Sequence, residues 1–158
     1  MKIFVSSSDV PIGYVTPKFP AIFWPLGITS PRYNESFLYY SVDIWKFTVY
    51  WVIIFFSGAY FLVGVAAFAS MNLRAYRERK IVASKKKAVV VQSVIVAASY
   101  LLAGVAQGFM SGAIIGLLLA AIYRAGALAM STWIPFSWGM ASILYHICSS
   151  YSTSSLLM

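Results

Sequence analysis

Few residues in this sequence have side chains suited to catalysis, and they do not form a complete set. The chain has one histidine, His146, and one cysteine, Cys148. Its four acidic residues are Asp9, Glu35, Asp43 and Glu78. General acid–base catalysis needs a base within reach of the reacting group, and a zinc site needs three or four ligands. No acid lies inside an apolar segment, so we expect neither an enzyme nor a bound metal or cofactor.

The histidine and the cysteine have simpler roles open to them. We expect His146 to form a hydrogen bond between helices, since no acid is placed to exchange protons with it. Cys148 is expected to fill space as a small apolar residue, and palmitoylation is the alternative if it lies at the cytosolic surface.

A stripe of glycines is the most regular feature of the chain. Gly104, Gly108, Gly112 and Gly116 stand at four-residue intervals in an uncharged stretch. Residues four apart lie on one face of a helix, where these glycines let a second backbone approach closely. Each glycine costs a helix in water about 1 kcal/mol relative to alanine, so the pattern favours a packing surface in a membrane. The stripe is expected to pack on the chain's own helices or to dock a partner or a second copy.

Basic residues form the second cluster. Seven of the twelve lysines and arginines fall between two apolar runs: Arg74, Arg77, Arg79, Lys80, Lys85, Lys86 and Lys87. A basic loop beside a membrane span indicates a cytosolic location and attraction to anionic phospholipid. The formal net charge of +8 therefore does not indicate a nucleic-acid partner. Arg124 stands apart from this cluster and is expected at a helix end, with its side chain reaching toward water.

Composition places the elements in a membrane. The chain has 158 residues, of which 61% are hydrophobic and 10% charged, against about 25% charged in soluble domains. We predict an all-α membrane protein with a helical domain over residues 43–158. Its three transmembrane helices are expected at about 44–70, 88–123 and 133–149, and the basic cytosolic loop at 72–87.

The second apolar run is too long for a simple span. As one straight helix, residues 88–123 would measure roughly 54 Å, against a hydrocarbon core of about 30 Å. Either the helix is tilted or bent, or the run holds two spans with a turn near Gln107, giving four in total. The unbroken glycine register across Gln107 favours one long helix. Gly126 is expected to stop that helix.

Residues 1–42 are expected to form an extended N-terminal arm. They hold five of the six prolines, interspersed with aromatic residues. With the basic loop cytosolic, this arm is lumenal and lies at the membrane interface or against a partner. Asn34 begins an Asn-Glu-Ser sequence, which is a possible N-glycosylation site.

Three motifs in this order support a family resemblance. They are the aromatic first span with its basic exit loop, the sequence Ile-Tyr-Arg-Ala-Gly at 122–126, and Ile-Pro-Phe at 134–136. The chain resembles the transmembrane protein 170 family over roughly residues 40–150. The resemblance implies three spans, a lumenal N-terminus and a location in the endoplasmic reticulum or nuclear envelope. It also implies a non-enzymatic role, since animal members are linked to the formation of membrane sheets and the nuclear envelope.

Two classes of function follow. The first is an accessory or structural subunit that packs against other membrane proteins in a larger complex, or a membrane-shaping factor. The alternative is a small channel-like or lipid-moving transport component. Three thin helices enclose little space, so a pore would require self-association.

Overall fold

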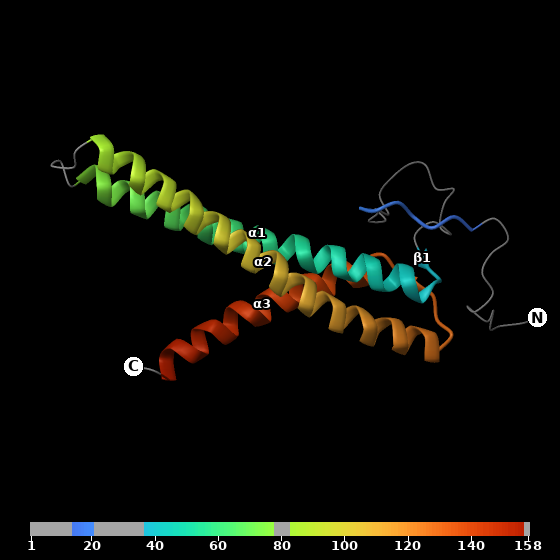
Figure 1. Cartoon of the computed structure of the whole chain (residues 1–158). Helices are drawn as coiled ribbons and strands as arrows, with labels where there is room; N and C mark the ends of the chain where they lie inside the picture. Colours follow the sequence, from blue (N-terminus) through green and yellow to red (C-terminus); the bar gives the residue numbers. More distant parts are fainter. Residues whose placement is uncertain (1–13, 21–36, 78–82, 157–158) are drawn as a thin grey trace, which may run out of the picture. The chain divides into compact units, whose positions relative to one another are not determined.

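The computed structural model describes residues 14–20, 37–77 and 83–156, and for 83–87 and 152–156 it describes the backbone alone. These ranges contain three helices, α1 (Ser41–Arg77), α2 (Ala83–Ala125) and α3 (Trp133–Leu156) (Figure 1). Two short strands, β1 (Phe37–Leu38) and β2 (Met130–Ser131), complete the described elements. The predicted all-α class is confirmed. Helices α1 and α2 are long and apolar enough to cross a membrane.

The second apolar run forms one helix. Helix α2 continues through Gln107 without interruption, so the prediction of a single long element is confirmed and the run does not turn there. Both long helices also extend into the sequence predicted as a basic loop at 72–87. Helix α1 continues to Arg77 and α2 begins at Ala83, because arginine, lysine and alanine are good helix formers. Residues 78–82 lie outside the described residues.

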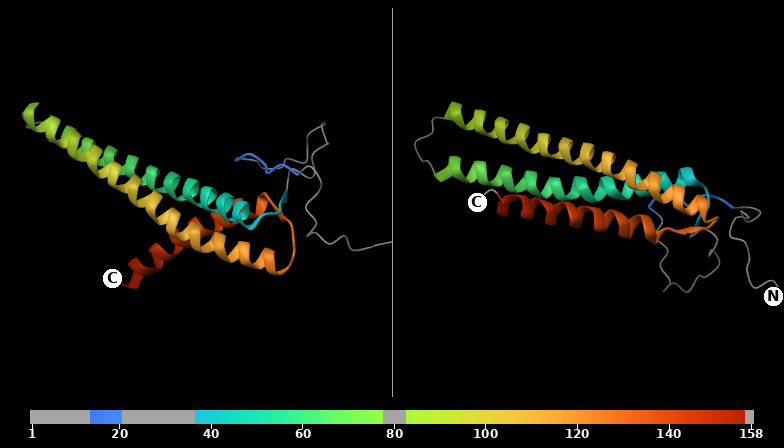
Figure 2. Two further views of the ribbon diagram at one scale, coloured as in Figure 1. Left: turned by 45° about the vertical axis from the view of Figure 1, so that its right-hand side comes forward. Right: turned by 90° about the horizontal axis from the view of Figure 1, so that it is seen from below.

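The chain divides into two compact units, Met1–Val52 with Met110–Met158, and Ile53–Phe109. The second unit contains the C-terminal part of α1 and the N-terminal part of α2, which lie side by side and antiparallel (Figure 2). Near its basic end, Asn72 Nδ2 donates a hydrogen bond to Ser93 Oγ at 3.2 Å. Ser93 is fully buried and donates in turn to the Val90 carbonyl. A polar contact therefore joins the two helices of this unit.

The first unit has a small hydrophobic core of its own. Strands β1 and β2 pair antiparallel, with Leu38 opposite Met130, and both side chains are fully buried. The core is completed by Ile44, Phe47, Leu119 and Ala120. The pairing joins the segment before α1 to the connection between α2 and α3.

The described part of the N-terminal arm packs on this unit. The ring of Phe19 contacts the rings of Phe47 and Trp51 at centroid distances of 5.5 and 5.3 Å. Tyr14 donates a hydrogen bond from its hydroxyl to the Phe37 carbonyl at 2.9 Å. Burial raises the pKa of Tyr14, and the nearby carboxylate of Asp43 adds to the rise. Residues 14–20 thus lie against their own chain. Asn34 lies outside the described residues.

Candidate functional site

The glycine stripe is buried, and its contacts can be described in each unit separately. In the second unit, Gly104 lies against Tyr60 of α1. A Cβ atom added at Gly104 would lie 2.6 Å from the Tyr60 Cβ atom, closer than real Cβ atoms approach. Gly108 is buried as well. Only glycine leaves room for Tyr60 at this position.

In the first unit, the stripe meets α1 through two further glycines. An added Cβ at Gly112 would lie 3.1 Å from the Val49 Cα and from the Val52 Cβ, and one at Gly116 would lie 2.9 Å from Trp45 Cδ1. The indole Nε1 of Trp45 donates to the backbone carbonyl of Ala113 at 3.3 Å. At Gly112 and Gly116 the neighbour is therefore α1 of the same chain. Docking of a partner helix on the stripe stays a prediction.

The predicted lipid-contacting residues are only partly described. Arg74 and Arg77 lie in the last turn of α1 and are exposed. Lys85, Lys86 and Lys87 lie in the first turns of α2, where the backbone alone is described. Arg79 and Lys80 lie outside the described residues. Contact of this cluster with anionic lipid stays a prediction.

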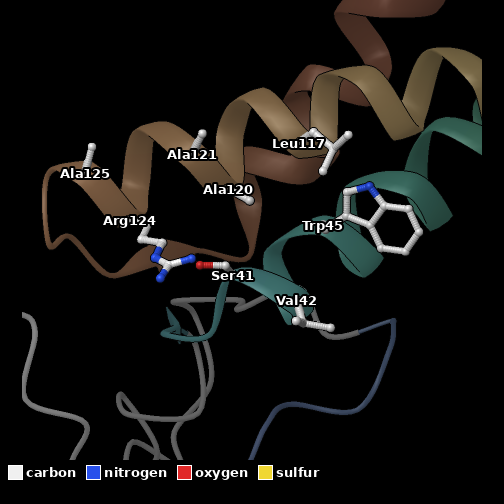
Figure 3. Close-up of a pocket in the computed structure, with 8 residues that line it drawn as sticks. All are labelled: Ser41, Val42, Trp45, Leu117, Ala120, Ala121, Arg124 and Ala125. Atoms are coloured by element: carbon white, nitrogen blue, oxygen red, sulfur yellow. The ribbon is translucent and has the colours of Figure 1, made fainter.

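A groove in the first unit is a candidate site that the sequence did not reveal. It has a volume of about 720 Å³ and lies between the first turns of α1 and the last turns of α2 (Figure 3). Its lining residues are Ser41, Val42, Trp45, Leu117, Ala120, Ala121, Arg124 and Ala125. The guanidinium of Arg124 points toward the hydroxyl of Ser41 (Figure 3). Arg124 is exposed, as expected for a charged residue at a helix end.

The end of α2 fixes the position of Arg124. The Leu128 N–H donates to the Tyr123 carbonyl at 3.1 Å, and the Ala127 N–H donates to the Arg124 carbonyl at 3.3 Å. This pair of bonds is the Schellman motif, whose penultimate residue is left-handed. That residue is Ala127, with φ of 47°. The left-handed residue therefore lies one position after Gly126, which was predicted to stop the helix. One sequence signal pointed to the groove: Arg124 is the single Lys or Arg after Lys87.

The histidine and the cysteine lie on α3. His146 is half-buried, and its backbone carbonyl accepts a hydrogen bond from Ser150 Oγ at 2.9 Å. Cys148 is exposed. Within residues 14–20, 37–77 and 83–156, no group of three or more His, Cys, Asp or Glu side chains is placed to hold a metal ion.

Comparisons with known proteins agree with these features. The family model for transmembrane protein 170A/B-like proteins matches residues 37–157, which include every strand and helix described above. The chain is also 43% identical over 152 residues to the uncharacterized protein YPR153W of Saccharomyces cerevisiae, covering 96% of each chain. No solved structure matches it. The resemblance in the sequence is thus confirmed, and the chain belongs to the transmembrane protein 170A/B-like family of membrane proteins.

Proposed function

We propose that this protein is a non-catalytic, three-span protein of the endoplasmic reticulum membrane that acts as an accessory or structural subunit, or as a membrane-shaping factor. The observation that carries the proposal is the length of uncharged helix in α2. Residues 88–123 are uncharged and helical throughout. At a tilt of 40°, the upper end of the usual range, such a helix still extends about 41 Å across a hydrocarbon core of about 30 Å.

The excess length lies at the end of α2 in the first unit. Trp45 of α1 packs against Gly116 of α2, and the next residue, Lys46, is exposed. Because lysine side chains gather at the boundary between hydrocarbon and headgroups, the last two turns of α2 lie at or beyond this boundary. Yet Leu118 and Ile122, one turn apart, are 59% and 62% exposed. Apolar side chains at this depth are stabilised by a partner protein or by a locally thickened bilayer.

The partner protein and the thickened bilayer correspond to the two forms of the proposed role. A partner that covers Leu118 and Ile122 would make this chain an accessory subunit of a larger assembly. A bilayer that thickens around them would make it a membrane-shaping factor, since the chain then alters local lipid packing. The basic residues at the other ends of the long helices support a cytosolic position for those ends.

Copurification tests the proposal. The variant Leu118→Ala with Ile122→Ala removes apolar surface that the chain itself leaves exposed. We expect this variant to lose proteins that copurify with the wild type in mild detergent. A matched control is Val94→Ala with Ile95→Ala, which changes two exposed residues of α2 in the second unit. Equal recovery of membrane partners by both variants and the wild type, with no change in membrane morphology on overexpression, would contradict the proposed role.

A lipid-moving or channel-like role is the second candidate, and the groove at Arg124 is the observation that favours it. Reconstitution of the purified chain in liposomes separates the two roles. Transbilayer movement of a fluorescent phospholipid, or leakage of a trapped solute, would favour transport. An intact permeability barrier would favour the structural role.

A further inference from the structure

We propose that the groove between α1 and α2 binds one acidic phospholipid of the surrounding bilayer, with the lipid phosphate at Arg124 and an acyl chain along Trp45 and Leu117. This site goes beyond the structural role proposed above and does not depend on it. All eight lining residues belong to the first unit.

The charge of the groove selects an anion. Arg124 is the single charged residue among those that line it. Lys46 follows Val42 by four residues on α1, so it lies on the same helix face, and it is exposed. The nearest acid along α1, Asp43, is half-buried and does not line the groove. An arginine and a lysine near an exposed groove are complementary to a phosphate oxyanion, and the arginine can bind it with two parallel hydrogen bonds.

The walls of the groove select a lipid over a free phosphate ion. Apart from Ser41 and Arg124, the lining residues are apolar, and three of them are alanines that leave space beside the Trp45 ring. Such walls offer a hydrated ion few hydrogen bonds, whereas an acyl chain gains free energy by covering them. Trp45 is itself held in place by its bond to the Ala113 carbonyl. The groove therefore combines one anion-binding end with an apolar channel, which is the pattern of a phospholipid.

The position of the groove also suits a lipid. Tryptophan and snorkelling lysine side chains gather at the boundary between hydrocarbon and headgroups, so Trp45 and Lys46 place the groove at this boundary. The site is separate from the basic residues Arg74 and Arg77, which lie at the other end of α1. Those residues attract acidic lipid in general, whereas the groove holds a single molecule.

Native mass spectrometry of the full chain tests the proposal. The protein is reconstituted in phosphatidylcholine nanodiscs that contain a minor fraction of phosphatidylserine, then released into mild detergent, and bound phosphatidylserine is counted. Arg124→Gln is expected to lower the affinity for phosphatidylserine by about tenfold, the effect of losing one charge-assisted contact. Ala121→Phe keeps the charge but fills the groove, and the same loss is expected. Ala125→Phe fills it from the next turn and serves if Ala121→Phe does not fold.

The control variant is Lys18→Gln, which removes an exposed positive charge that neither lines the groove nor belongs to the basic cluster at 74–87, and it is expected to leave the bound lipid in place. Three outcomes would overturn the proposal. In the first, the groove variants retain phosphatidylserine like the wild type. In the second, Lys18→Gln loses as much lipid as Arg124→Gln. In the third, the wild type carries no lipid and forms a dimer that Ala121→Phe abolishes, which would assign the groove to a second copy of the chain.

Discussion

At the scale of single residues, the end of α2 depends on one strained position. Ala127 adopts a left-handed backbone with φ of 47°, a conformation that costs residues with a Cβ atom roughly 1–2 kcal/mol. Its N–H and that of Leu128 cap the last carbonyls of the helix. The strain is therefore maintained by the hydrogen bonds that hold Arg124 at the groove.

Replacing this residue with glycine is expected to stabilise the protein. Ala127→Gly removes the Cβ strain and should raise the free energy of unfolding by about 0.5–1 kcal/mol, after allowance for the greater freedom of glycine in the unfolded chain. Unfolding in mixed micelles, followed by circular dichroism, measures the change. Gly126→Ala is the control, because its added Cβ would lie 3.3 Å from the Leu128 Cγ atom and should not stabilise. Equal stability of wild type and Ala127→Gly would show that the left-handed backbone of Ala127 carries no measurable strain.

At the scale of elements, the glycines of the two long helices differ in what surrounds them. Gly104→Ala should destabilise the packing of the second unit by about 1–3 kcal/mol, because Tyr60 must move with its backbone to make room. Gly58→Ala should do the opposite and stabilise α1 by up to about 1 kcal/mol, since nothing lies within 4 Å of its added Cβ. Unfolding of both variants in the same micelles gives the comparison. A loss of stability in both would mean that Gly58 also has a neighbour.

The helices could be predicted from the sequence because long uncharged runs between charges leave few other structures in a membrane. The unbroken glycine register also indicated that α2 continues through Gln107. The strands could not be predicted: β1 and β2 have two residues each, too few to show an alternating pattern. The left-handed residue fell at Ala127 because the capping bonds, and not the glycine itself, set where the helix ends.

The candidate site was predicted only in part for a similar reason. The glycine spacing identified a close helix contact, but spacing alone does not say whether the neighbour belongs to the same chain. Arg124 was visible as an isolated charge near a helix end. Its proximity to Ser41 and Trp45, about 80 residues earlier, results from the antiparallel packing of the helices, which a single sequence does not encode locally.

At the scale of the whole molecule, the main prediction is the membrane topology, that is, which side of the membrane each terminus faces. The three spans proposed above, with the basic segment in the cytosol, would put the N-terminus in the lumen and the C-terminus in the cytosol. A glycosylation acceptor fused to the C-terminus should therefore stay unmodified, while one fused to the N-terminus should be glycosylated. A shift in electrophoretic mobility that is reversed by an endoglycosidase reports the modification. Modification at both ends would mean that the chain crosses the membrane an even number of times.

The pairing of β1 with β2 has a consequence for how the protein is made. Leu38 leaves the ribosome about 90 residues before Met130, a delay of roughly 5–20 s at ordinary rates of translation. Both long helices are synthesised during that interval, and Leu38 cannot pair with Met130 until it ends. Assembly of this end is therefore a late step of biogenesis, which is completed only after β2 has been synthesised.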